Sequence, residues 1–257
     1  MKNRTTTIFI CIAVAVLIFG AQAFAAGVQP GPFPKTWKLW TDENREIGTV
    51  EVWNSNQELF IKINPACSEE LGCSGKKFKI IDTQIAWAPE EDLINGLPFV
   101  KKGSPNPGKF NFKTDYDPYE DAPLIPLDLQ EELDFSWGKY KTEEERKQYF
   151  AVHVTLAIFD EYGFQIGTDD AWAKGPHTLG DVTNAFYFTY PPIHPLRGHF
   201  IDSPVVGISY KGPTQVGVTA DASDEDGGGF LFFPDETIEF SVGTVKLGSA
   251  AAAKKVS

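Results

Sequence analysis

The segment DASDEDGGG (residues 221–229) carries the densest set of metal-ligating side chains, because carboxylate oxygens are the ligands that Ca²⁺ prefers. Placing its first glycine on the invariant glycine of an EF-hand loop puts Asp224 and Asp226 on ligand positions. It also puts Ala222 and Phe233 where two further ligands are required. We therefore exclude an EF-hand and predict a solvated turn between strands. A weak calcium site at Asp224 and Asp226 remains the alternative.

The histidines offer a second set of possible ligands, and there are four of them: His153, His177, His194 and His199. None belongs to an HExxH motif, so unrelated positions are expected rather than a zinc site. His153 stands out because Ala151, Thr155 and Ala157, which share its strand face, are small. We expect it to be a buried, hydrogen-bonded histidine, with a place in a binding cleft as the alternative.

Signatures of catalysis are missing from the sequence. There is no G-x-S-x-G elbow, phosphate-binding loop or dinucleotide fingerprint. The acid pairs Glu90-Glu91 and Asp169-Asp170 could serve a glycosidase, but neighbouring acids of this kind are usually solvated loop charges. We predict a non-enzymatic protein with no catalytic residues.

Tryptophan is the remaining lead to a binding function. All six tryptophans lie between residues 37 and 172, and most are expected in a core. Trp37 and Trp172 stand in turn-like contexts and are predicted to be exposed. Because exposed aromatic faces stack on the apolar faces of sugars, a carbohydrate-binding module is the alternative function.

The N-terminus has the features of a secretory signal peptide. Lys2 and Arg4 precede an apolar run from Ile8 to Phe19, and the small residues Ala23 and Ala25 follow it. We predict cleavage after Ala25, with Ala23 as the alternative. The run is shorter than the roughly 20 residues that span a bilayer, so no transmembrane segment is expected after cleavage.

The predicted export agrees with the number of cysteines and with the net negative charge of the chain. Cys67 and Cys73 lie beyond the signal peptide and are predicted to form a structural disulfide in an oxidising compartment. The formal net charge of −12 disfavours nucleic-acid binding. We expect a secreted or cell-surface protein, with the periplasm as the alternative compartment.

Alternating apolar and polar residues predict an all-β fold. The stretches 48–53 and 58–64 read as a hairpin, 77–88 as a strand region, and 148–163 as a strand region buried on one face. Residues 89–126 are rich in proline and are predicted to be a surface excursion. Thr142 and Glu145 form a capping box that predicts one or two helical turns.

These signals define two β units. After an extended lead-in at 26–36, we expect an antiparallel β-sandwich, jelly-roll-like, at 37–190. A linker at 191–197 leads to a small second β unit of five short strands at 198–248, and 249–257 reads as a tail.

The stretches IGTVEVWNSNQELFIKI, TQIAWA, KKGSPNPGKF, YFAVHVTLAIF and AWAKG resemble an uncharacterised all-β domain family of secreted bacterial proteins. Members of that family show a VGTV strand, an NGNPIPGQF-like loop, an AAHAVV-like strand and an AWG-like turn. The resemblance spans about 40–190 and places His153 on the motif histidine, whereas the cysteine loop departs from the pattern. It implies no activity.

A second resemblance covers about 198–248, where DSPVVGISY, GGGFLFF and ETIEFSVGTVKLG occur. This order is similar to a small β module of bacterial surface proteins and lipoproteins. Both resemblances imply an extracellular, modular protein. We therefore expect a secreted, adhesin-like interaction protein whose partner is an extracellular protein or a glycan.

Overall fold

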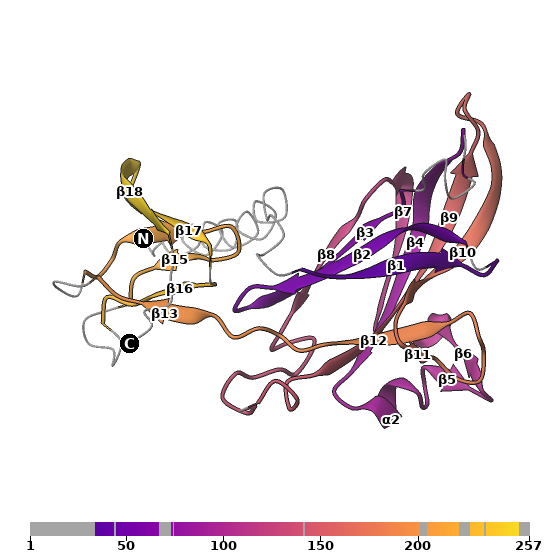
Figure 1. The fold of residues 1–257 in the computed structure, drawn as a ribbon, viewed down its shortest axis with the longest axis horizontal. Helices are drawn as coiled ribbons and strands as arrows, with labels where there is room; N and C mark the ends of the chain where they lie inside the picture. Colours follow the sequence, from indigo (N-terminus) through magenta and orange to yellow (C-terminus); the bar gives the residue numbers. More distant parts are fainter. Residues whose placement is uncertain are drawn as a thin grey trace, which may run out of the picture. The chain divides into compact units, whose positions relative to one another are not determined.

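A computed structural model describes residues 34–43, 45–66, 73, 75–140, 142–200, 205–220, 227–233 and 235–251. The described chain is mostly β-strand with almost no helix, and it divides into two compact units, with the boundary between Pro195 and Leu196 (Figure 1). This boundary falls inside the stretch that the sequence predicts as a linker.

The described residues of the larger unit, which spans 34–195, contain twelve strands and two short helical turns. The strands are β1 (Lys35–Thr41), β2 (Glu46–Asn54), β3 (Glu58–Asn64), β4 (Lys77–Ala88), β5 (Val100–Lys101), β6 (Ser104–Pro105), β7 (Phe112–Glu120), β8 (Leu124–Asp128), β9 (Gln148–Phe159), β10 (Gln165–Lys174), β11 (His177–Thr178) and β12 (Phe186–Tyr190). The helical turns are α2 (Glu91–Ile94) and the 3₁₀ turn η2 (Pro107–Lys109).

One large antiparallel sheet dominates this unit and curls into a sandwich-like fold (Figure 1). Its order is β7-β4-β9-β10-β1-β2-β3-β8, and all neighbouring strands in this order are antiparallel. The N-terminal end of β9 also pairs with β12, which in turn pairs with β11. The prediction of an all-β antiparallel fold is confirmed.

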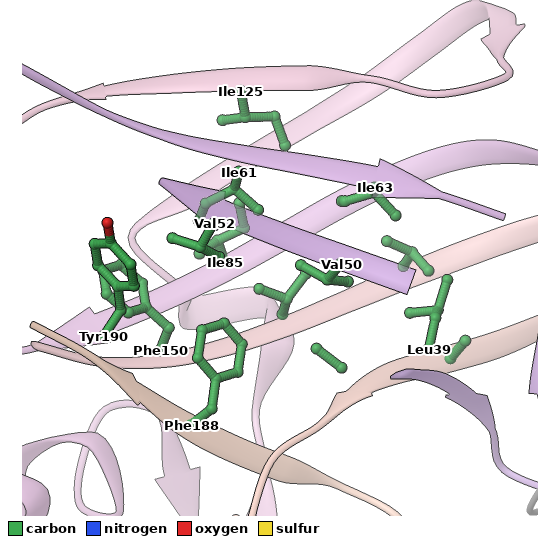
Figure 2. Close-up of a cluster of buried hydrophobic side chains, with 14 of the residues drawn as sticks. Leu39, Val50, Val52, Ile61, Ile63, Ile85, Ile125, Phe150, Phe188 and Tyr190 are labelled. Atoms are coloured by element: carbon green, nitrogen blue, oxygen red, sulfur yellow. The ribbon is translucent and has the colours of Figure 1, made fainter. Parts of the chain in front are cut away.

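The inner face of the curled sheet holds the main hydrophobic core, in which Leu39, Val52, Ile61, Phe150 and Phe188 come together from five strands (Figure 2). Alternation along the strands explains this, since successive side chains point to opposite faces. On β9, Phe150, Val152, Val154 and Leu156 all enter the core, as the sequence predicts. The predicted hairpin of β2 and β3 is also confirmed.

A second apolar cluster covers part of the outer face. It joins Ala86 of β4, Ala151 of β9 and Trp172 of β10 to side chains from the connecting segments, namely Ile94, Phe99, Phe110 and Leu179. Figure 1 shows α2, β5, β6 and β11 gathered at this end of the sheet. The small residues on this face of β9 leave room for the covering segments.

One sequence-based expectation for this unit is wrong. Residues 89–126 are not a surface excursion throughout, because β7 pairs with β4 and β8 begins at Leu124 beside β3. Most residues of β7 are exposed or half-buried, so the strand lacks a strong apolar pattern.

The capping box at Thr142 and Glu145 forms both reciprocal hydrogen bonds, at 3.1 and 3.2 Å. Arg146 N–H donates to the Thr142 carbonyl at 3.2 Å, so the capping box begins a single turn, the shorter of the two expected lengths. β9 then begins at Gln148.

The described part of the smaller unit, from residue 196 onward, contains all five predicted short strands and one more. The strands are β13 (Leu196–Gly198), β14 (Ser209–Lys211), β15 (Val216–Val218), β16 (Phe230–Phe232), β17 (Thr237–Val242) and β18 (Val245–Ala251). Their sheet order is β15-β14-β17-β18, with β13 paired to β16. β13 begins inside the predicted linker and β18 extends into the predicted tail.

Candidate functional site

His153 lies on the outer face of β9, between two neighbouring strands. It is in register with Gln84 of β4 on one side and with Trp172 of β10 on the other. The imidazole ring packs against the Trp172 indole, with 4.6 Å between ring centroids. Only 8% of His153 is exposed, so its predicted burial is confirmed.

The hydrogen bonding of His153 is less complete than a buried histidine usually requires. Its Nε2 atom lies 3.6 Å from Asp170 Oδ1, and that oxygen also accepts a hydrogen bond from the Thr155 hydroxyl at 3.0 Å. The Nδ1 atom has no hydrogen-bond partner among the described residues. The expectation of a fully hydrogen-bonded histidine is therefore wrong for this ring.

Electrostatics around His153 favour the neutral imidazole. Burial lowers the pKa of His153 below its ordinary value, because a charged ring loses hydration there. The carboxylates of Asp170, Asp82 and Asp42 oppose this shift without reversing it. Acidification must therefore place a charge next to the Trp172 ring.

The His153 neighbourhood supplies few groups for metal chemistry. In the part of the chain that the structure describes, no three histidine, cysteine, aspartate or glutamate side chains converge as metal ligands. His153 and Asp170 thus form a polar pair at the edge of the outer apolar cluster.

Trp172 is buried, so its predicted exposure is wrong. It lies within β10, which continues to Lys174, and only 5% of it is exposed. His153 packs on it from β9, and the edge of Phe110 approaches it at 6.1 Å between centroids. The following glycine gave the segment AWAKG a turn-like appearance, but the strand continues past the tryptophan.

Trp37 lies on β1 and is half-buried. The predicted exposure of this side chain is therefore only partly correct. Its ring stacks on Phe188 at 3.9 Å between centroids and 23° between planes. Because one indole face is occupied and Trp172 is buried, these two tryptophans do not form a surface for stacking on sugar rings.

Sequence reasoning missed the tip of the β9–β10 hairpin. Tyr162, Phe164 and Ile166 are exposed there by 78%, 69% and 55%, and Figure 1 shows the turn at one extremity of the larger unit. The turn is held by Asp160, whose Oδ1 accepts hydrogen bonds from the backbone N–H groups of Tyr162 at 3.0 Å and Phe164 at 2.8 Å. The sequence YGF between acidic residues was the available signal.

Asp224 and Asp226 lie outside the described residues, so the calcium alternative stays a prediction. The segment that contains them is closed at its base by two backbone hydrogen bonds. Ala220 donates to the Gly229 carbonyl at 3.0 Å, and Gly228 donates to the Ala220 carbonyl at 2.9 Å. This pairing favours the predicted turn between strands.

The predicted disulfide also stays a prediction, because Cys67 lies outside the described residues. Cys73 is buried and belongs to the main hydrophobic core. The predicted signal peptide, residues 1–25, likewise falls in the part of the chain that the structure does not describe.

Comparisons with known proteins place this chain in no group: no protein-family model, no curated protein and no solved structure matches it. Within the described residues, no helix has the length and apolar character needed to span a membrane.

Proposed function

We propose that this protein is an exported, non-enzymatic interaction protein of the adhesin-like kind, and that it contacts an extracellular protein through the tip of the β9–β10 hairpin. The observation that carries the proposal is the exposure of Tyr162, Phe164 and Ile166 on one tight hairpin. Large apolar side chains of this kind are the usual anchors of protein interfaces. Fully burying each of them against a partner would contribute roughly 1.5–3 kcal/mol.

The hairpin tip is already ordered by its own hydrogen bonds, which favours binding. Besides the two bonds to its carboxylate, Asp160 donates its N–H to the Phe164 carbonyl at 3.0 Å and accepts from Gly163 N–H at 3.1 Å. A loop fixed in this way loses little conformational entropy on association. The tip therefore suits a preformed apolar pocket on the partner.

Site-specific photocrosslinking in cells that make the protein tests this proposal. A photoreactive phenylalanine analogue at Tyr162 is expected to give a discrete adduct, which excess purified wild-type protein should suppress. The matched control places the same probe at Leu93, another exposed apolar residue, on α2. The Y162S/F164S double variant should fail to compete. Identical adducts from both probe positions, or equal competition by the double variant, would overturn the proposal.

A further inference from the structure

A groove of about 270 Å³ lies beside the main core. One wall comes from the end of β4 and the segment before β7, and the other from residues 129–140, here called the rim segment. The lining residues are Trp87, Pro89, Asn111, Glu132, Leu133, Asp134, Lys139 and Tyr140.

Trp87 is held rigidly in this groove. Its indole Nε1 donates a hydrogen bond to the Glu132 carbonyl at 3.0 Å, and its backbone N–H donates to Asn111 Oδ1 at 2.8 Å. The half-buried ring also packs against the main core. Trp87 therefore joins both walls of the groove and presents its remaining surface in a fixed orientation.

The rim segment is equally well fixed, by aromatic packing and by backbone hydrogen bonds. Phe135 stacks on Tyr140 at 5.1 Å and meets the edge of Trp137 at 4.9 Å. The Trp137 indole donates to the Asn56 carbonyl at 2.8 Å, and Phe135 N–H donates to the Leu129 carbonyl at 2.7 Å. The groove thus exists before any ligand binds.

Polar groups around the two aromatic rings remain available to a ligand. The Asn111 oxygen is occupied by Trp87, but its amide N–H groups have no hydrogen-bond partner among the described residues. The Asp134 carboxylate is exposed at the rim. Lys139 lies 5.2 Å from the centre of the Tyr140 ring. The groove therefore offers donors and acceptors beside aromatic surface.

We infer that this groove binds one ring of a neutral carbohydrate. A sugar ring has an apolar C–H face that packs on an aromatic ring, and hydroxyl groups at its edge that both donate and accept hydrogen bonds. Trp87 supplies the aromatic surface, because Tyr140 is already stacked on Phe135, and Asn111, Asp134 and Lys139 supply the polar partners. The volume is slightly below the ~300–1,000 Å³ of sites for drug-sized ligands, which suits a single ring.

Charge favours a neutral sugar over an anionic one. The groove brings the two carboxylates of Glu132 and Asp134 together with the one ammonium of Lys139, so negative charge is in slight excess. The Glu132 carboxylate already uses part of its hydrogen-bonding capacity, because its Oε2 accepts a hydrogen bond from Asp128 N–H at 2.6 Å. A strongly anionic sugar would meet these carboxylates, in a chain of net charge −12.

Two-dimensional NMR of the tryptophan indole N–H groups can locate the site directly. The signal of Trp87 is assigned by its loss in Trp87→Phe, and the folded wild-type protein is then titrated with neutral oligosaccharides of glucose, mannose, xylose and galactose. We expect at least one of them to shift the Trp87 signal at millimolar concentration while the Trp37 and Trp172 signals stay in place. If no oligosaccharide shifts the Trp87 signal, the inference is wrong.

Surface variants separate the groove from the hairpin tip. Asp134→Gly and Lys139→Ala remove exposed groups and should fold normally, because glycine suits the left-handed backbone of Asp134 (φ 50°). Each should weaken binding by about tenfold, the effect of 1.4 kcal/mol, in native gels that contain a polysaccharide of the sugar that shifts the Trp87 signal. Y162S/F164S should bind as wild type, because its substitutions lie at the β9–β10 tip. Unchanged binding in both groove variants would overturn the inference, as would retention of acidic polysaccharides alone. Either result leaves the crosslinking test of the hairpin unaffected.

Discussion

Asn54 and Tyr190 lie 136 positions apart, and a buried hydrogen bond of 2.7 Å runs from the Tyr190 hydroxyl to Asn54 Oδ1. The same oxygen accepts Ile193 N–H at 2.8 Å, and the Asn54 amide donates to the carbonyls of Ser55 and Ile193. One side chain therefore ties the end of β12 and the segment after it to the end of β2.

Replacing Asn54 with alanine should destabilise the larger unit by about 2–4 kcal/mol. The substitution leaves the Tyr190 hydroxyl and the Ile193 N–H buried without acceptors, and each costs roughly 1–3 kcal/mol. Tyr190→Phe is the matched control, because it removes the donor itself and should cost only about 1 kcal/mol. Urea unfolding measures both. Equal losses in the two variants would show that Asn54 is not the centre of this network.

His153 should make stability depend on pH in the mildly acidic range. Burial lowers the folded-state pKa of His153 below its ordinary value of 6.5, so the unfolded chain binds more protons below about pH 6.5. The free energy of unfolding should therefore fall as pH drops from there toward the folded pKa, by at most about 1.4 kcal/mol per pH unit. Above about pH 6.5 this contribution is constant.

The variant His153→Gln tests that dependence, with urea unfolding measured between pH 5 and pH 7.5. The stability of the wild type relative to the variant should decrease on acidification, because glutamine does not titrate. The control His177→Gln replaces an exposed histidine and should leave the pH profile unchanged. If the wild type and His153→Gln have parallel profiles, the buried imidazole is not responsible.

The strands that sequence could predict are those with one strongly apolar face. β4 occupies the predicted stretch 77–88, and β9 occupies 148–159 of the predicted stretch 148–163, because the chain turns at Asp160. β7 could not be recognised, because as an edge strand it exposes Lys113, Asp115 and Asp117 and contains Pro118. Its place in the sheet depends on pairing with β4, which is a tertiary relationship.

The candidate binding surfaces were less predictable for the same reason. Trp172 reads as a turn residue, yet packing by His153 and Phe110 buries it. The groove combines Trp87, Asn111 and Tyr140, which come together only when residues 129–140 pack over the end of β4. No short motif contains such a set.

The predicted disulfide makes a direct chemical prediction. The exported chain, from residue 26 onward, should show no reactive thiol when it is unfolded without reductant, and two after reduction. Cys73→Ser should destabilise the larger unit by about 2 kcal/mol or more, since it removes the cross-link and places a hydroxyl in the core. Two reactive thiols before reduction would contradict the prediction.

Glu236 should be the polar residue on which the smaller unit depends most. It is buried, and its carboxylate accepts hydrogen bonds from Phe233 N–H at 2.8 Å, from Thr214 N–H at 3.2 Å and from the Thr214 hydroxyl. Glu236→Ala leaves two backbone donors unpaired, so we expect a loss of about 2–4 kcal/mol. Glu236→Gln keeps an acceptor and should lose less.

Hydrogen exchange followed by mass spectrometry can assign that loss to the correct unit in the full chain. In Glu236→Ala, exchange should accelerate in β14 and β17, while β4 and β9 keep wild-type protection. Glu239→Gln is the matched control on β17, because Glu239 is exposed and its ion pair with Lys246 lies at the surface. Such pairs contribute about 1 kcal/mol or less. Equal acceleration in both variants would mean that the buried carboxylate has no special role, because the exposed one differs from it mainly in burial and in its backbone donors.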